Sequence, residues 1–370
     1  MAWSKQQEGA IKSVIEWLKD SDGKQIFRLF GFAGSGKTTL AKEMASTVIG
    51  KVLYACFTGK AALVLISKGC AGAQTIHSLI YKAVEDPWTG KITFELNLDS
   101  PLSTAELLII DEVSMVGEDL AKDLLKFGKK ILVLGDPAQL PPVKGEGYFI
   151  NAEPDVMLTE VHRQAADNPI IRMSMDVRDG LALKPGSYGD SQVIQRADID
   201  RDAMRELVLG ADQLLCGLNK TRQSFNARVR EINKIESGLP VIGDRLVCLR
   251  NNREKGLLNG SLWTVKKHQN ITTLNLSLMD VESIDNSKQA VVGVETPNEF
   301  FQGREKELDW KKLRKSDQFT YGYCLTVHKS QGSQWPNVLL FDESRVFRED
   351  AAKHLYTGIT RAADKVTVVV

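Results

Sequence analysis

The stretch that decides the fold is Gly31-Phe32-Ala33-Gly34-Ser35-Gly36-Lys37-Thr38. It fits the phosphate-loop pattern, in which a glycine and four further residues precede Gly-Lys-Ser/Thr. The apolar run 26–30 before it predicts a buried strand, and the spacing of 39–45 after it predicts a helix. Glycines let backbone N–H groups turn toward phosphate oxygens, and the positive end of the helix adds to that attraction. The stretch therefore predicts a nucleotide site where a strand passes into a helix.

The residues of this loop have separate expected roles. Lys37 would reach the β- and γ-phosphates, and the Thr38 hydroxyl would ligate Mg²⁺. The candidate nucleotide-binding residues of the loop are Gly34, Ser35, Gly36, Lys37, Thr38 and Thr39.

An amphipathic helix is expected upstream, over residues 4–18, with Ser4 as its N-cap. Gln7 on this helix has two interpretations. It is either a solvated helix residue or an amide that reads the adenine edge, because an amide both donates and accepts hydrogen bonds.

Two acids close the next informative strand, Leu107-Leu108-Ile109-Ile110-Asp111-Glu112. After a phosphate loop, this pattern predicts that Asp111 holds Mg²⁺ and that Glu112 polarises the attacking water. The strand 131–134 follows, and Gln139 in the loop after it could sense the γ-phosphate. Strands and helices alternate through residue 140, which predicts a doubly wound α/β domain.

A segment of different character lies before the strand that ends at Asp111, over residues 83–105. It combines a turn-rich stretch with polar–apolar alternation, which predicts a small inserted hairpin. Trp88 or Phe94 could be a wedge or stacking residue, and simple packing of the aromatic ring onto the host domain is an equal alternative. Upstream, the strand 52–57 ends in a turn that carries Thr58 and Lys60, at the edge where parallel sheets bind ligands.

Composition limits the classes of protein that fit. The chain has 370 residues and a formal net charge of +1, so it offers room for two or three domains and no global basic signature. It contains no apolar run long enough to cross a membrane, and its first residues contain no apolar signal-peptide core. Five scattered cysteines without Cys-x-x-Cys spacing favour a reducing compartment and argue against structural zinc.

Taken in order, the motifs resemble those of superfamily 1 helicases, specifically the RecD/Dda branch. The acidic stretch Asp111–Met115 and the stretch Gly135–Pro142 are similar to this branch rather than to the UvrD/Rep branch, whose acidic motif runs Asp-Glu-x-Gln-Asp. The other matching stretches are Gly31–Thr38, Thr58–Ala62, Thr75–His77, Val161–Gln164, Leu325–Gly332 and Tyr356–Ala362. The resemblance implies two RecA-like domains, ATP and Mg²⁺ as cofactors, and 5′→3′ travel on DNA.

The resemblance also assigns roles to residues in the second half of the chain. Arg163 would contact the γ-phosphate from across a cleft between the two domains, and Arg361 would be an arginine finger. Gly332 would lie near the nucleotide. The candidate DNA contacts are Thr58, Lys60, His77, Phe94, Asn219, Thr326, His328 and Lys329.

The expected domain borders follow from the same resemblance. A first RecA-like domain would cover residues 1–165, with the hairpin insertion at about 83–105. The second would combine 166–250 with 319–370, and a small SH3-like β-barrel would occupy 251–318. The basic run 311–315 inside this insertion could touch the DNA backbone, and a solvated linker is the favoured interpretation.

The function that we expect is ATP-dependent unwinding of DNA, in which the chain translocates 5′→3′ on single strands. The alternative is a DNA-stimulated ATPase or translocase that remodels protein–DNA complexes with little unwinding. A binding subunit with a relic nucleotide site is disfavoured, because Lys37, Glu112 and Arg361 are all present. Expected partners are single-stranded DNA, tailed duplex DNA, and single-strand-binding, replication or recombination proteins. We expect a cytoplasmic, nucleoid-associated monomer in a bacterial or phage-infected cell.

Overall fold

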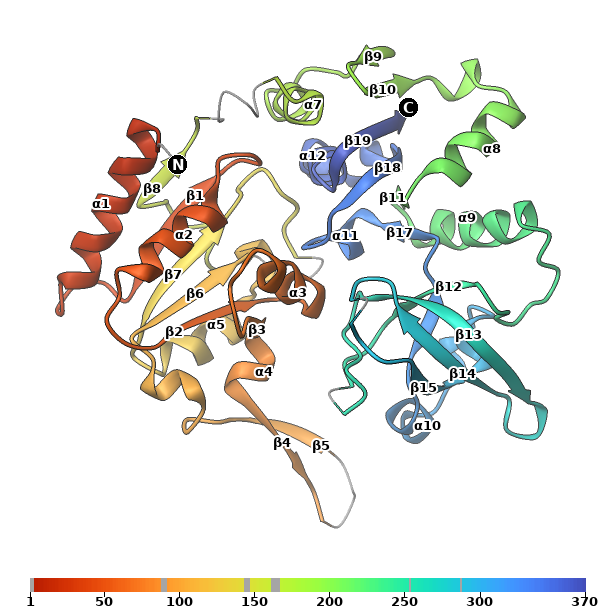
Figure 1. The fold of residues 1–370 in the computed structure, drawn as a ribbon, viewed down its shortest axis with the longest axis horizontal. Helices are drawn as coiled ribbons and strands as arrows, with labels where there is room; N and C mark the ends of the chain where they lie inside the picture. Colours follow the sequence, from red (N-terminus) through yellow and green to blue (C-terminus); the bar gives the residue numbers. More distant parts are fainter. Residues whose placement is uncertain (1–2, 88–91, 143–146, 161–166, 253, 287) are drawn as a thin grey trace. The chain divides into compact units, whose positions relative to one another are not determined.

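The computed structural model describes residues 3–87, 92–142, 147–160, 167–252, 254–286 and 288–370 (Figure 1). Contacts divide the chain into two compact units. One unit combines Met1–Phe57 with Ala61–Arg178, and the other combines Thr58–Lys60 with Asp179–Val370. The division therefore falls after helix α7 (Pro169–Arg178), whereas the sequence prediction placed the border at residue 165. The guanidinium of Arg178 lies 4.0 Å from the centre of the Phe32 ring, which ties α7 to the first unit.

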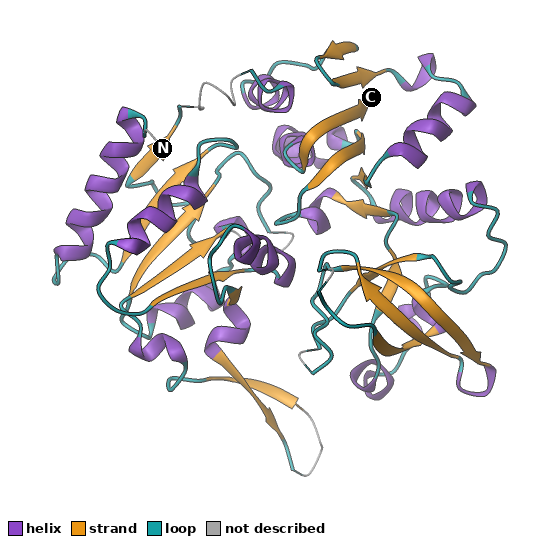
Figure 2. Ribbon diagram, viewed as in Figure 1, coloured by secondary structure: helices purple, strands orange, loops and turns teal. Residues whose placement is uncertain are grey.

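The first unit contains a six-stranded sheet in which every neighbouring pair is parallel (Figure 2). The strand order is β3-β2-β6-β7-β1-β8. The strands are β1 (Ile26–Gly31), β2 (Val52–Cys56), β3 (Gln74–Thr75), β6 (Leu107–Asp111), β7 (Lys130–Gly135) and β8 (Val156–Leu158). Because the strands are parallel, all their carboxyl ends meet at one edge, and this edge carries the phosphate loop.

Successive side chains of β6 point to opposite faces of the sheet, and because those of residues 107–110 are all apolar, helices cover both faces. Leu107 and Ile109 pack into one buried cluster, and Leu108 and Ile110 pack into the other. The first cluster includes apolar residues of α1 (Lys5–Lys19) and α2 (Lys37–Ser46). The second includes residues of α4 (Ile76–Ile80) and α5 (Glu118–Leu125). The predicted doubly wound α/β fold is confirmed for this unit.

Helix α1 begins where the sequence predicts, at an N-cap formed by Ser4. The Ser4 hydroxyl accepts a hydrogen bond from the Gln7 backbone, and the Gln7 side chain accepts one from the Ser4 backbone. This capping box satisfies two N–H groups that a helix otherwise leaves without partners. Helix α3 (Gly59–Ser67) starts directly after β2, close to the expected position.

A two-stranded antiparallel ribbon extends from α4 in the first unit. It consists of β4 (Tyr81–Glu85) and β5 (Ile92–Leu96), and Ala83 is paired with Phe94. The Tyr81 hydroxyl donates a hydrogen bond of 2.6 Å to the Asp123 carboxylate on α5, which fixes the base of the ribbon to the unit. Trp88 lies outside the described residues.

The second unit contains a six-stranded sheet of order β17-β11-β18-β19-β10-β9. Its neighbouring strands are parallel except for the pair β9–β10. The strands are β9 (Gly186–Tyr188), β10 (Ser191–Ile194), β11 (Gln213–Cys216), β17 (Cys324–Thr326), β18 (Trp335–Phe341) and β19 (Ala362–Val369). The helices of this part are α8 (Arg201–Gly210), α9 (Asn219–Ile232), α11 (Val327–Ser330) and α12 (Ala351–Ile359). Residues of α8 and α9 share one buried cluster with this sheet.

A separate antiparallel sheet of five strands also belongs to the second unit, in the order β15-β14-β13-β12-β16. The strands are β12 (Arg245–Cys248), β13 (Leu262–Ile271), β14 (Leu276–Ser283), β15 (Val292–Pro297) and β16 (Phe319–Tyr321). The sheet therefore begins before residue 251 and ends after residue 318, because β12 and β16 pair with each other. The basic run predicted as a linker lies in helix α10 (Trp310–Lys315), whose N-cap is Asp309.

In the part of the chain that the structure describes, no helix is long and apolar enough to cross a membrane. All five cysteines lie in that part, and each is buried with a free thiol.

Candidate functional site

The phosphate loop connects β1 to α2, and the side chain of its lysine contacts the loop backbone. The Lys37 ammonium donates hydrogen bonds of 2.6 Å to the Gly31 carbonyl and 3.0 Å to the Phe32 carbonyl. Gly36 caps α2 with φ at 80°, a backbone conformation that residues with a side chain rarely adopt. The lysine is therefore held over the loop whose N–H groups would surround a phosphate.

Gln7 contacts this loop from helix α1. Its side chain is 4% exposed, and its amide nitrogen donates a hydrogen bond of 3.2 Å to the Ser35 carbonyl. The interpretation of Gln7 as a solvated helix residue is therefore wrong, because the amide is buried against the loop. Contact between Gln7 and a nucleotide base stays a prediction.

Thr38 and Asp111 meet at the carboxyl edge of the sheet. The Thr38 hydroxyl donates a hydrogen bond of 2.9 Å to one Asp111 carboxylate oxygen, and the other oxygen accepts one from the Glu112 backbone. A hydroxyl and a carboxylate are oxygen ligands of the kind that Mg²⁺ prefers. The described residues contain no cluster of three or more His, Cys, Asp or Glu that could hold a metal without further ligands. A magnesium ion here would depend on phosphate oxygens and water for its remaining ligands.

Glu112 follows with a strained backbone. Its φ of 55° and ψ of 48° lie in the left-handed region, which is uncommon for residues other than glycine. Such conformations concentrate at functional sites, where they aim a side chain in a required direction. Glu112 therefore has a backbone feature that a purely structural surface acid would not need.

Gln139 lies in the loop after β7, the strand between β6 and β1 in the sheet. Its side chain is 8% exposed, and its amide oxygen has no hydrogen-bond partner among the described residues. A buried amide oxygen without a partner is costly unless a water or ligand completes its hydrogen bonding. Because β7 lies between β6 and β1, the loop that carries Gln139 leaves the sheet at the same edge as the loops after Gly31 and Asp111.

Arg361 is buried at the end of α12 in the second unit. Its guanidinium donates hydrogen bonds of 3.1 Å to the Thr357 carbonyl and 3.3 Å to the Ser333 carbonyl. Ser333 directly follows Gly332, whose φ is 74°. The structure thus brings two predicted nucleotide-site residues of the second unit together. Arg163 lies outside the described residues.

The predicted DNA contacts in the first unit form an aromatic group. The exposed His77 ring lies edge-on to the Phe94 ring, with 4.6 Å between ring centres. Phe94, on strand β5 of the ribbon, is 59% exposed. Exposed aromatic rings of this kind can stack on bases.

Lys60 is a predicted DNA contact, but it is buried, whereas a lysine that binds DNA phosphate is normally exposed. It is 5% exposed, and its ammonium lies 3.1 Å from the Asp285 carboxylate and 4.3 Å from the centre of the Trp335 ring. Burial lowers the pKa of Lys60, and Asp285 opposes that shift. Thr58, two residues earlier, is half-buried. DNA contacts through Thr58 and Lys60 stay predictions.

Helix α11 and its N-cap carry three more of the predicted DNA contacts, Thr326, His328 and Lys329. Thr326 is its N-cap, and the Thr326 hydroxyl accepts a hydrogen bond from the Lys329 backbone. The His328 ring lies 5.5 Å from the Phe347 ring, and burial lowers the pKa of His328. Burial, followed by repulsion from Arg222, lowers the pKa of Lys329 to about 8.

Asn219 and Lys329 line the same cavity, of about 620 Å³, beside α9 and the five-stranded sheet. Arg222, Arg230, Phe301 and Tyr321 also line it. Sequence analysis did not assign Arg222 or Phe301 to a site, because only the fold brings α9 and the segment after β15 together. Sequence analysis also missed Arg178, because only the fold places its guanidinium over the Phe32 ring of the phosphate loop.

A parallel α/β unit with a phosphate loop, a hydroxyl–carboxylate pair and a buried amide at one sheet edge defines a nucleotide-binding protein of the P-loop class. The family model described as "AAA domain" matches residues 2–198, just over half of the chain. A second model, "UvrD-like helicase C-terminal domain", matches residues 321–369.

Curated relatives and solved structures agree with these matches. The chain is 29% identical to the ATP-dependent RecD2 DNA helicase of Deinococcus radiodurans over 98% of its own length and 49% of the relative. It is 24% identical to the ATP-dependent DNA helicase Pif1 of Bdellovibrio bacteriovorus, covering 87% of this chain and 78% of the relative. A crystal structure of Pif1 helicase from Bacteroides, in complex with ADP-AlF3 and ssDNA, matches with a TM-score of 0.58 at 17% identity. That match covers 99% of this chain and 92% of the other.

The chain therefore belongs to the AAA-domain family. The two family models and the RecD2 and Pif1 relatives together support a superfamily 1 helicase of the RecD/Pif1 type. Its mixed α/β fold matches the Pif1 structures and fits two RecA-like domains. The chain spans about half the length of its RecD2 relative.

Proposed function

We propose that this protein is an ATP-dependent DNA helicase that moves 5′→3′ along single-stranded DNA and separates duplex ahead of it. The observation that carries the proposal is the edge of the first sheet, where Lys37 covers the phosphate loop and Thr38 contacts Asp111. That arrangement supports ATP hydrolysis. The names of the RecD2 and Pif1 relatives support DNA as the polymer on which the energy is used.

Magnesium fits the residues at this edge. Thr38 and Asp111 would hold the ion, which would neutralise charge on the β- and γ-phosphates when bound. Glu112 would orient the attacking water, and the unpartnered amide oxygen of Gln139 would accept a hydrogen bond from that water. Lys37 would exchange its two carbonyl partners for phosphate oxygens.

Two elements would adapt this motor to DNA. We propose that the ribbon β4–β5 acts as a strand-separating pin, with Phe94 as its stacking residue. We further propose that the five-stranded antiparallel sheet is an SH3-like barrel inserted in the second RecA-like domain. The cavity that Asn219 and Lys329 share beside this sheet supports a phosphate-backbone contact there, because lysine and asparagine both donate to phosphate.

The decisive experiment measures ATP turnover with and without single-stranded DNA, beside strand separation on duplexes that carry only a 5′ or only a 3′ tail. We expect DNA-stimulated turnover and separation of the 5′-tailed duplex alone. A Lys37→Ala protein should show neither activity, and Lys42→Ala, on the same helix α2, should keep both.

Other outcomes would overturn parts of this proposal separately. Stimulated turnover without separation of either duplex would favour the translocase alternative. Separation of the 3′-tailed duplex would overturn the direction of travel. If DNA does not change ATP turnover, the assignment of the nucleotide site would stand and the assignment of DNA as the polymer would be wrong.

A further inference from the structure

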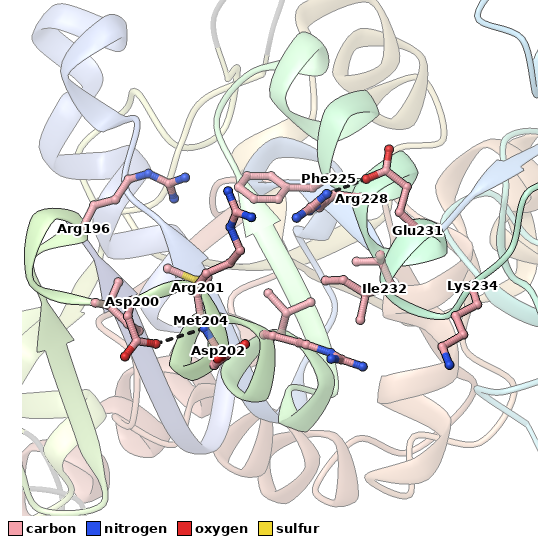
Figure 3. Close-up of a pocket in the computed structure, with 14 residues that line it drawn as sticks. Arg196, Asp200, Arg201, Asp202, Met204, Phe225, Arg228, Glu231, Ile232 and Lys234 are labelled. Atoms are coloured by element: carbon pink, nitrogen blue, oxygen red, sulfur yellow. Dashed lines mark hydrogen bonds and ion pairs between the residues drawn. The ribbon is translucent and has the colours of Figure 1, made fainter.

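A second cavity, of about 630 Å³, lies between helices α8 and α9 of the second unit (Figure 3). It contains none of the residues assigned above to nucleotide or DNA. The walls come from both helices and from the segment that precedes α8. Figure 3 shows Arg196 and Lys234 at opposite ends of this pocket, with apolar side chains between them.

The floor of the pocket is apolar. Val208 and Val229 are buried, and Met204, Phe225 and Ile232 are half-buried beside them. These residues form the outer edge of the cluster that joins α8 and α9 to the sheet. The Phe225 ring stacks on Phe341 of β18 with 4.0 Å between ring centres, so the floor is supported by the core. Such a floor can receive an apolar side chain, whereas a nucleic-acid backbone offers nothing apolar to it.

The rim of the pocket is cationic. Five basic side chains and three acidic ones line the cavity, and all of them are exposed. The basic residues are Arg196, Arg201, Arg205, Arg228 and Lys234, and the acidic ones are Asp200, Asp202 and Glu231.

Two of the three acids have local partners. Glu231 is paired with Arg228 at 2.7 Å, and Asp200 caps helix α8 by accepting from the backbone of Asp202 and Ala203. By contrast, four cations have no ion-pair partner among the described residues, namely Arg196, Arg201, Arg205 and Lys234. The rim therefore presents an excess of unpaired positive charge around an apolar depression.

We propose that this pocket docks a short acidic peptide segment of a partner protein, with an apolar side chain inserted between α8 and α9. Carboxylates of the segment would pair with the rim arginines, whose planar guanidinium groups bind carboxylates in a fixed geometry. The apolar side chain would cover the depression formed by Met204, Phe225 and Ile232. Charge complementarity would set the rate and the specificity of docking, and burial of the apolar anchor would hold the segment in place.

The test uses the full chain and fluorescein-labelled peptides in fluorescence anisotropy. The probe is a short peptide of glutamate and leucine residues. Its two controls replace every leucine by serine or every glutamate by lysine. We expect saturable binding of the first peptide, which weakens as salt rises, and at least about tenfold weaker binding of both controls.

Protein variants locate the site. The double substitution Arg201→Glu and Arg205→Glu places two acids on the exposed side of α8, so we expect it to weaken peptide binding at least about tenfold. Lys288→Glu, an exposed charge reversal in the same unit away from the pocket, should leave binding unchanged. ATP turnover with single-stranded DNA should stay unchanged in both proteins, which shows that they are folded.

Three results would overturn the proposal. The first is no saturable binding of the glutamate–leucine peptide to the unmodified protein. The second is equal peptide affinity in the double variant. The third is a serine control that binds as well as the leucine peptide, together with loss of single-stranded DNA affinity in the double variant. That third result would make the rim a nucleic-acid surface instead of a peptide site.

Discussion

The Thr38 hydroxyl lies 2.9 Å from the Asp111 carboxylate, although the two residues come from different strand–loop junctions. Thr38 is on the first turn of α2 after β1, and Asp111 ends β6. Strand β7 lies between β1 and β6, so the contact crosses the carboxyl edge of the sheet. The contact holds together the hydroxyl and the carboxylate that we propose as magnesium ligands, which would reduce the ordering that a metal–nucleotide complex requires.

Thr38→Val should therefore weaken magnesium use more than ATP binding. The valine keeps the shape of the side chain but removes the hydroxyl ligand, so half-maximal ATP turnover should need at least about tenfold more Mg²⁺. Thr38→Ser retains the hydroxyl and is the matched control. A magnesium titration of turnover at saturating ATP makes the measurement. An unchanged magnesium requirement in Thr38→Val would exclude this hydroxyl as a ligand.

Arg361→Ala should reduce ATP hydrolysis and spare ATP binding. An arginine that stabilises charge on the transferred phosphate contributes roughly 10³–10⁵ in related reactions, so turnover should fall by at least about 10³-fold. ATP affinity is measured with a fluorescent nucleotide analogue. Arg361→Lys keeps the charge but loses the planar fork, and should recover only a small part of the rate.

A structural role for Arg361 makes a different prediction. Its guanidinium donates to the carbonyls of Thr357 and Ser333, so its removal takes a donor from two buried acceptors and should lower the melting temperature, although the Thr360 hydroxyl still donates to Thr357. The two effects separate when turnover is measured well below the melting temperature. If the variant is folded there and retains its turnover, the arginine serves packing alone.

The nucleotide edge was accessible from sequence because its determinants are local. The phosphate-loop pattern, the apolar run ending at Asp111 and the capping residue Ser4 each lie within a few positions of the structure that they specify. The parallel arrangement then follows from alternating strands and helices, and it places Thr38 and Asp111 at one edge. Local pattern and topology were sufficient for these features.

Features that depend on distant side chains could not be predicted in this way. Three contacts join segments that are far apart in the chain. They are the hydrogen bond from Gln7 to the Ser35 carbonyl, the Lys60–Asp285 ion pair and the contact of the Arg178 guanidinium with the Phe32 ring. The grouping of α7 with the first unit and the extension of the five-stranded sheet to β12 and β16 depend on similar contacts. No residue type or spacing in the sequence predicts such pairs before the fold is known.

Phe94→Ala should lower duplex separation more than DNA-stimulated ATP turnover. The ring is 59% exposed and lies edge-on to His77, so its loss removes a stacking surface with little effect on the core. Phe94→Tyr keeps the ring and should keep unwinding. Leu98→Ala removes another exposed apolar side chain, just after β5, and is the matched control. If unwinding and turnover fall in parallel, or if both are unaffected, Phe94 is not a wedge.

Lys329 should make DNA affinity depend on pH in a range where ordinary lysines do not titrate. Burial, with repulsion from Arg222, lowers its pKa to about 8, so in the free protein its positive charge is lost as pH rises through that value. A neutral lysine cannot neutralise a phosphate. Affinity for single-stranded DNA should therefore fall between about pH 7 and about pH 9, and the salt dependence of binding should decrease by about one counterion. Lys329→Arg keeps its charge over this range and should flatten the profile, whereas Lys220→Arg on α9 should leave it unchanged. A wild-type affinity that is constant over this range, measured by anisotropy without ATP, would exclude Lys329 from the phosphate contacts.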